Sequence, residues 1–71
     1  MGVRELHSDA IRMRNSGKTP EEIRVYLFKA VTALGGVITE IELPPGGFEI
    51  TAASGERIRY TKADGFGYHP S

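Results

Sequence analysis

Apolar residues recur with a helical period between residues 19 and 36. At about 100° per residue they form one continuous stripe on a single side of the predicted helix. The stripe consists of Ile23, Leu27, Ala30 and Leu34, with Tyr26 and Val31 beside it. Thr19 is the predicted N-cap, Pro20 takes the first helical position, and Glu22 completes a Thr-x-x-Glu capping box. A pair of glycines follows the last apolar position, so the sequence indicates both ends of this helix.

A shorter helix is predicted over residues 3–16, before the central one. Its apolar residues have the same spacing and form one stripe, and charged side chains cover most of its remaining surface. The stripe consists of Val3, Leu6, Ala10 and Met13. Gly17 suits the left-handed position that follows many helix C-termini. The two helices are therefore expected to be separated by a short turn.

After residue 36 the period of the apolar positions changes from 3.6 to 2, which is typical of β-strands. We expect strands over residues 37–43, 47–52 and 56–62. Prolines and glycines between the first two strands predict a turn. Gly55 suits the left-handed position of a three-residue hairpin loop between the second and third strands.

Side-chain alternation predicts a register for both hairpins. A four-residue first loop pairs Leu43 with Phe48, and a three-residue second loop pairs Phe48 with Tyr60. Both pairings bring apolar residues to the same face, and a slip of one residue would destroy that match.

These elements predict an α+β fold of the order ααβββ, with two helices packed on one face of a three-stranded antiparallel meander. Residues 1–62 are expected to form one domain, because a chain of 71 residues is too short for two. Residues 63–71 show no clear period. We expect them to form a flexible C-terminal tail.

The composition narrows the range of functions. Nine basic and nine acidic side chains cancel, so the chain lacks the overall positive field on which non-specific nucleic-acid binding depends. Cysteine is absent, which excludes disulfides and thiolate chemistry. No apolar run approaches a membrane span of about 18 residues, and the N-terminus does not resemble a secretory signal. We therefore expect a cytoplasmic protein that does not bind membranes.

The sequence offers no set of residues for catalysis, for a cofactor or for a metal. A zinc site needs three or four ligands at close range, and His7 and His69 are the only histidines. No serine has a partnered base at a suggestive spacing, and the glycine pairs match no phosphate-binding loop or dinucleotide fingerprint. We expect a protein that is not an enzyme and holds neither a cofactor nor a metal.

The predicted register also assigns charged residues to the outer face of the sheet. This face would carry Glu40, Glu42, Glu49, Arg57 and Arg59. Three acids against two arginines give it a slightly negative field. Cross-strand charge pairing is then the simplest interpretation, and nucleic-acid binding by this face is disfavoured.

Val25 and Phe28 lie almost opposite the apolar stripe of the central helix, where the sheet would not cover them. Either the first helix covers them, with Ile11 contributing, or a partner does, because contiguous exposed apolar surface marks interaction sites. Our leading hypothesis is a small non-enzymatic protein-interaction module that uses Val25, Phe28 and Ile11. Its expected partner is a second copy of the chain, in a homodimer, or another protein.

Residues 17–23, Gly-Lys-Thr-Pro-Glu-Glu-Ile, resemble the opening of many helix-turn-helix DNA-binding domains. In those domains a short helix leads to a Leu-Gly turn and a recognition helix. Here the Leu34-Gly35 pair comes later, and a strand is expected after it. The resemblance implies an alternative function, a small nucleic-acid-binding regulator. Its contacts would be the basic residues near the inter-helix turn, which are Arg12, Arg14, Lys18 and Arg24.

Overall fold

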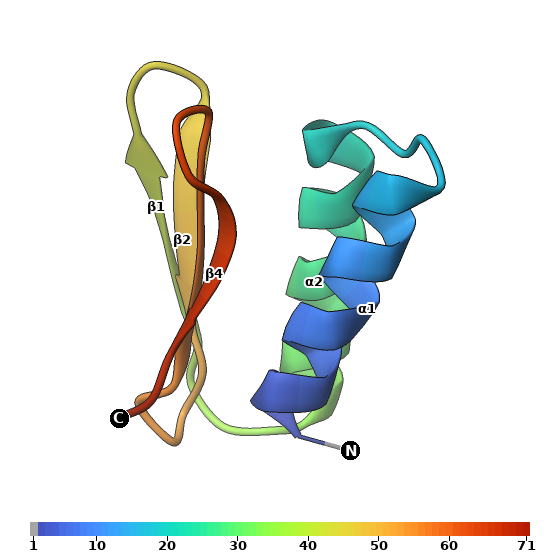
Figure 1. The fold of residues 1–71 in the computed structure, drawn as a ribbon. Helices are drawn as coiled ribbons and strands as arrows, with labels where there is room; N and C mark the ends of the chain where they lie inside the picture. Colours follow the sequence, from blue (N-terminus) through green and yellow to red (C-terminus); the bar gives the residue numbers. More distant parts are fainter. Residues whose placement is uncertain (1) are drawn as a thin grey trace.

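The computed structural model describes residues 2–71 and consists of two layers, a pair of helices and a sheet (Figure 1). The helices are α1 (Val3–Asn15) and α2 (Pro20–Ala33). The strands are β1 (Thr39–Leu43), β2 (Gly47–Thr51), β3 (Arg57–Thr61) and β4 (Gly65–His69). They form an antiparallel meander in the order β1-β2-β3-β4, and both helices lie on one face of it. The predicted α+β class is confirmed, with four strands instead of three.

The ends of α2 are those that the sequence predicts. The Thr19 side chain accepts a hydrogen bond from the backbone N–H of Glu22, and the Glu22 carboxylate accepts one from the backbone N–H of Thr19 at 3.0 Å. That backbone bond, together with the Thr19 hydroxyl, lowers the pKa of Glu22 below its ordinary value. Gly17 has a φ of 98° in the turn before this cap, a conformation that glycine adopts without steric cost.

The core lies between the two layers and draws on both helices and three of the strands. Tyr26 of α2 donates a hydrogen bond of 3.0 Å to Asp9 of α1, and this bond joins the two helices at the margin of the core. The buried apolar residues are Val3, Leu6, Ala10, Ile23, Leu27, Val31, Phe48, Ile50, Ala52, Ile58, Tyr60 and Phe66. At about 25 cal/mol per Å² of apolar area removed from water, this cluster is the main stabilising contribution to the fold.

The hairpin between β2 and β3 has the predicted register. Phe48 lies opposite Tyr60, and Ile50 lies opposite Ile58, all on the face that the helices cover. The rings of Phe48 and Tyr60 stack with their centroids 5.8 Å apart. Sequence alternation was sufficient here because both strands have a helix above them.

The register predicted for β1 is wrong by one residue. Leu43 lies opposite Gly47 and not Phe48, so the loop contains three residues instead of four. The side chains of Glu40 and Glu42 therefore belong to the helix-facing side, opposite Ile50 and Phe48. Ile41, at 46% exposure, turns to the outer face. A slip of one residue moves every side chain of a strand to the other face.

The structure also differs from the sequence prediction at the C-terminus. The predicted flexible tail includes residues 65–69, but these form β4, an edge strand paired with β3. Phe66 is only 8% exposed, and its ring packs against Tyr60 with the centroids 4.7 Å apart. The expected tail therefore supplies part of the core.

The helices do not cover the sheet evenly. The main contacts of α1 are with β3 and β4, and those of α2 are with β2. Neither helix packs mainly over β1, which has no buried residue. An incompletely covered strip of the inner face is left beside α2.

Candidate functional site

A groove runs between α2 and the inner face of β1. Its volume is about 420 Å³, and it is lined by Glu21, Arg24, Val25, Phe28, Lys29, Glu40 and Glu42. The helix supplies the apolar side chains of this lining, whereas β1 supplies only carboxylates. We call this surface the α2–β1 groove.

Arg24 joins the two walls of the groove. Its Nε donates to Glu40 at 2.9 Å, and its Nη2 donates to Glu42 at 2.6 Å. The hydrogen bond from Arg24 lowers the pKa of Glu42 below the ordinary carboxyl value, and the two carboxylates raise the pKa of Arg24. The guanidinium carbon also lies 5.1 Å from the centre of the Phe48 ring, a cation–π geometry. Arg24 therefore holds β1 against α2.

Val25 and Phe28 lie on the open side of this groove. They are 48% and 41% exposed, so α1 does not cover them. Ile11 is 37% exposed and lies one helical turn after His7, on the same side of α1. This is the side that faces β4, because His7 Nε2 donates to the Phe66 carbonyl at 3.2 Å. Ile11 thus belongs to the β4 side of α1 and contributes nothing to the groove. Val25 and Phe28 line the groove together, whereas Ile11 is not among its lining residues.

The four basic residues proposed for nucleic-acid contact do not form one cluster of free cations. Arg24 is held by Glu40 and Glu42. Arg12 pairs with Asp9, and the Arg14 guanidinium donates to the Lys18 carbonyl. A strand follows α2, so no helix stands where a recognition helix would be.

The outer face of the sheet differs in charge from the expectation. Because Glu40 and Glu42 belong to the inner face, the outer face of β2 and β3 carries Glu49 against Arg57 and Arg59. Its field is positive instead of slightly negative. The sequence did not reveal this positive surface, because the number of acidic residues assigned to the outer face depends on the register of β1.

Two classes of site receive no support from the residues 2–71. No three histidine, aspartate or glutamate side chains in this range gather closely enough to hold a metal ion. Neither helix in this range has the length and apolar content needed to cross a bilayer. The α2–β1 groove and the outer face of the sheet are the two surfaces on which charged side chains gather beside a hollow.

Comparisons of the chain with protein-family models, with curated proteins and with solved structures found no match.

Proposed function

We propose that this chain is a small non-enzymatic protein-interaction module that forms a homodimer through α2 and the α2–β1 groove. The observation that carries the proposal is the exposure of Val25 and Phe28 beside a groove that no other part of residues 2–71 fills. Exposed aromatic and apolar side chains next to a concave surface are typical of protein interfaces.

The charges around Val25 favour a second copy of the chain as the occupant. Glu21 and Lys29 stand one helical turn before and one turn after Val25, on the same side of α2. If two α2 helices pack antiparallel with Val25 at the two-fold axis, Glu21 of each copy meets Lys29 of the other. A two-fold interface requires this kind of self-complementarity. Neither residue has an ion-pair partner elsewhere in residues 2–71.

The groove has room for the aromatic side chain of the partner. A cavity of about 150 Å³ accommodates a benzene molecule, and the volume here is about 420 Å³. Phe28 would enter the partner's groove along its apolar wall. Arg24 donates to both carboxylates of the groove, so each of them keeps a hydrogen-bond donor when an aromatic ring enters.

Sedimentation equilibrium over a concentration series tests the proposal. We expect Phe28→Ala to weaken the dimer by about thirtyfold, the loss of on the order of 2 kcal/mol that truncation of a central aromatic contact produces. Ile11→Ala is the matched control, because it truncates an equally exposed apolar side chain on the other side of the molecule. It should leave the dissociation constant unchanged.

Charge reversal distinguishes a second copy from an unrelated partner. In Glu21→Lys both symmetric contacts become Lys–Lys, and in Lys29→Glu both become Glu–Glu. Each variant alone should therefore be monomeric where the unaltered chain is dimeric. An equimolar mixture of the two should form a heterodimer, because every contact is then between opposite charges. A chain that stays monomeric at about 1 mM, or a mixture that does not associate, would overturn the proposal.

A further inference from the structure

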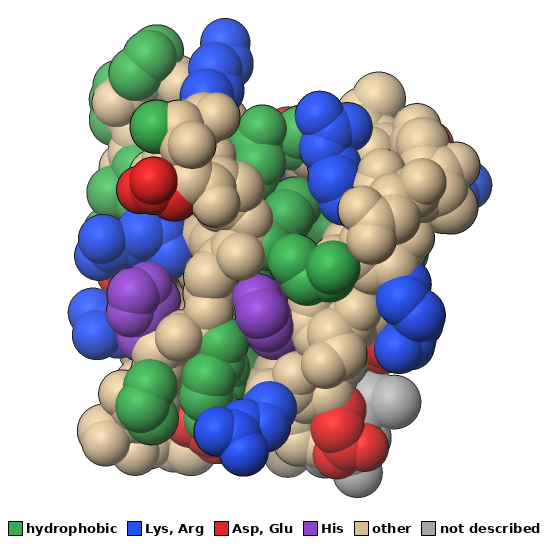
Figure 2. Space-filling view, in the orientation of Figure 1, with side chains coloured by type: hydrophobic (Ala, Val, Ile, Leu, Met, Phe, Trp, Pro, Cys, Tyr) green, Lys and Arg blue, Asp and Glu red, His purple; other side chains and the backbone are tan. Residues whose placement is uncertain are grey.

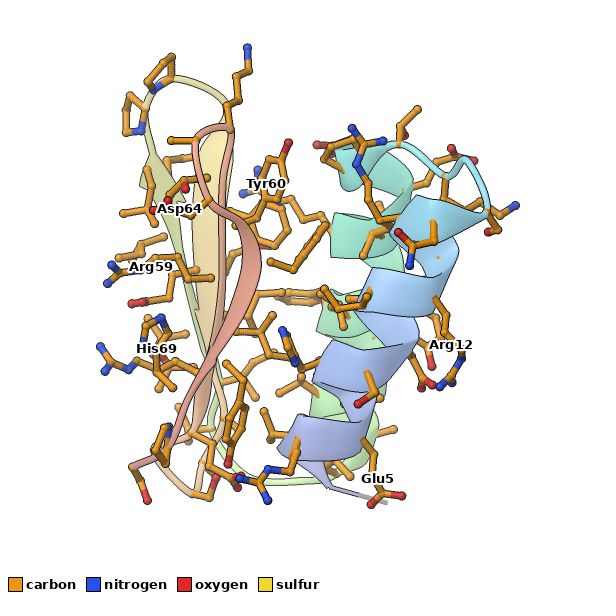
Figure 3. All side chains as sticks on the ribbon, in the orientation of Figure 1. Glu5, Arg12, Arg59, Tyr60, Asp64 and His69 are labelled. Atoms are coloured by element: carbon orange, nitrogen blue, oxygen red, sulfur yellow. The ribbon has the colours of Figure 1, made fainter. Side chains whose placement is uncertain are left out.

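The outer face of the sheet is a second surface that no helix covers (Figure 3). Alternation along the strands assigns three positions of each strand to this face, and the register aligns them in rows. One row consists of Ile41, Glu49, Arg59 and Gly67. The next consists of Thr39, Thr51, Arg57 and His69. Three cationic or ionisable donors therefore lie side by side on β3 and β4.

Glu49 holds the two arginines in place from beneath. It is only 7% exposed although it belongs to the outer face, because the guanidinium groups lie over it. Its Oε2 accepts from Arg59 Nε at 2.9 Å, and Arg57 Nη1 lies 3.8 Å from the same oxygen. One carboxylate thus faces two guanidinium groups, and one positive charge is left over.

Within residues 2–71, most donors of these two arginines make no hydrogen bond. Arg59 bonds Glu49 through Nε, and within residues 2–71 neither of its terminal amino groups has a hydrogen-bond acceptor. Arg57 makes no side-chain hydrogen bond within the same range. Guanidinium groups carry five donors in a planar fork that matches the oxygens of a phosphate.

A hollow lies beside this cluster because β4 carries glycines on its outer face. Its volume is about 210 Å³, and it is lined by Arg59, Thr61, Asp64, Gly65, Gly67 and His69. Gly67 lies directly opposite Arg59 and leaves the floor without a side chain. In Figure 3 Arg59 lies between Asp64 and His69, on the side of the sheet away from the helices. Figure 2 shows blue and purple side chains gathered along this margin of the molecule.

We infer that this hollow binds a phosphate monoester of a small hydroxylated molecule. The phosphate lies against Arg57, Arg59 and His69, where donors and surplus positive charge coincide. Asp64, at the opposite end of the hollow, accepts a hydrogen bond from a hydroxyl of the same ligand. A single-stranded nucleic acid fits less well, because its bases stack on aromatic side chains and the outer face carries no phenylalanine or tyrosine.

Two-dimensional NMR of the full chain at low salt tests the inference, with ribose 5-phosphate as the probe. We expect saturable shifts at the amides of residues 57–69, and none with ribose alone. Arg59→Gln should weaken binding by about tenfold or more, the effect of removing a charge-assisted hydrogen bond. Arg14→Gln is the matched control, because it removes the same charge from an exposed site at the end of α1 and should have no effect.

Gly67→Val fills the floor of the hollow without changing any charge. A Cβ at Gly67 would lie 3.6 Å from His69 Nε2, an ordinary contact, so this variant should fold and fail to bind. The inference is overturned if ribose 5-phosphate causes no shifts, or if Arg14→Gln weakens binding as much as Arg59→Gln. It is also overturned if an oligonucleotide binds through this face and the monoester does not.

Discussion

The two edge strands of the sheet are held in opposite ways. β4 is fixed by apolar burial and by α1: Phe66 enters the core, and Arg4 of α1 lies over the Tyr68 ring at 5.5 Å. His7 of α1 also donates a hydrogen bond to the Phe66 carbonyl of this strand. β1 has no such cover. It is fixed to α2 through the two charge-assisted hydrogen bonds of Arg24.

This difference shows that a domain with a small core can attach its two edge strands by different interactions. An exposed edge strand is a template for unwanted pairing, and inward-pointing charged residues are one of the ways in which proteins protect it. Glu40 and Glu42 belong to the inner face in this way, and they line the groove beside α2. The α2–β1 side is therefore the side at which we propose that a second copy docks.

The largest expected effect concerns the apolar attachment of β4. Phe66→Ala should reduce the free energy of unfolding by about 3–5 kcal/mol, because it removes a buried ring and leaves a cavity. Domains of this size have total stabilities near the lower end of about 5–15 kcal/mol, so this variant is expected to be largely unfolded. The milder Phe66→Leu, at about 1–2 kcal/mol, keeps the effect measurable by urea denaturation.

Ile41→Ala is the corresponding change on β1. Its side chain lies on the outer face and is about half exposed, so the expected loss is within about 0.5 kcal/mol. Equal losses for Phe66→Leu and Ile41→Ala would show that the two edges do not differ in the way described.

A smaller effect is expected from the polar attachment of β1. Arg24→Met keeps the length of the side chain but leaves the half-buried Glu40 and the exposed Glu42 without this donor. The free energy of unfolding should fall by about 1–2 kcal/mol, because water replaces part of the lost charge-assisted hydrogen bonding. Amide hydrogen exchange should accelerate in β1 before it does in β4.

Arg12→Met is the matched control for the loss of an arginine ion pair. Arg12 pairs with Asp9 across one turn of α1 and is largely exposed, so less than about 0.5 kcal/mol is expected. If adding Glu40→Gln to Arg24→Met restores part of the lost stability, that part of the loss comes from the unpaired Glu40 carboxylate. Equal stabilities of Arg24→Met and Arg12→Met would contradict a structural role for Arg24.

The smallest expected effect is a difference in pH dependence between the two edges. The hydrogen bond from Arg24 lowers the pKa of Glu42, and the hydrogen bond from Tyr68 lowers the pKa of Glu56. Each carboxylate therefore contributes stability that is present above its unfolded pKa of 4.5 and is lost as the pH falls below it. Both edges should weaken in acid.

Only the β4 edge should also weaken in alkali through its own contact. The bond to Glu56 raises the pKa of Tyr68 above 10.0, so its contribution is complete below pH 10.0 and is lost as the pH rises through the folded-state pKa. Urea midpoints measured across pH should show Tyr68→Phe flattening both limbs. Glu42→Gln should flatten the acid limb alone, and an equal change in its alkaline limb would refute this assignment.

The helices and the central hairpin were predictable because each has a local signal that agrees with its burial. The capping box at Thr19 sets the start of α2, and the apolar residues of β2 and β3 face a helix layer. Local and tertiary preferences point in the same direction there.

β1 was misread because its apolar alternation does not correspond to burial. Ile41 and Leu43 look like the inward set, but no helix packs over this strand to bury them. The ion pairs of Arg24 with residues 16 and 18 positions later put the glutamates on the inner face instead. Such a long-range pair leaves no periodic signal in the sequence.

β4 was missed for a different reason. Phe66 and Tyr68 alternate with Gly65 and Gly67, which is a period of two, but glycine is depleted in strands and weakens the signal. Sequence reasoning singled out Val25 and Phe28 on the helical wheel. The α2–β1 groove and the hollow on the outer face of β4 became visible only with the observed positions of β1 and β4.

The contact between α1 and β4 has a consequence for synthesis of the chain. α1 is the first of the six elements in the order of synthesis, and β4, which packs against it, is the last. The burial of Val3, Leu6 and Ala10 is therefore complete only after Phe66 has been added. A chain interrupted before residue 65 would leave part of this apolar surface exposed and open to aggregation or chaperone binding.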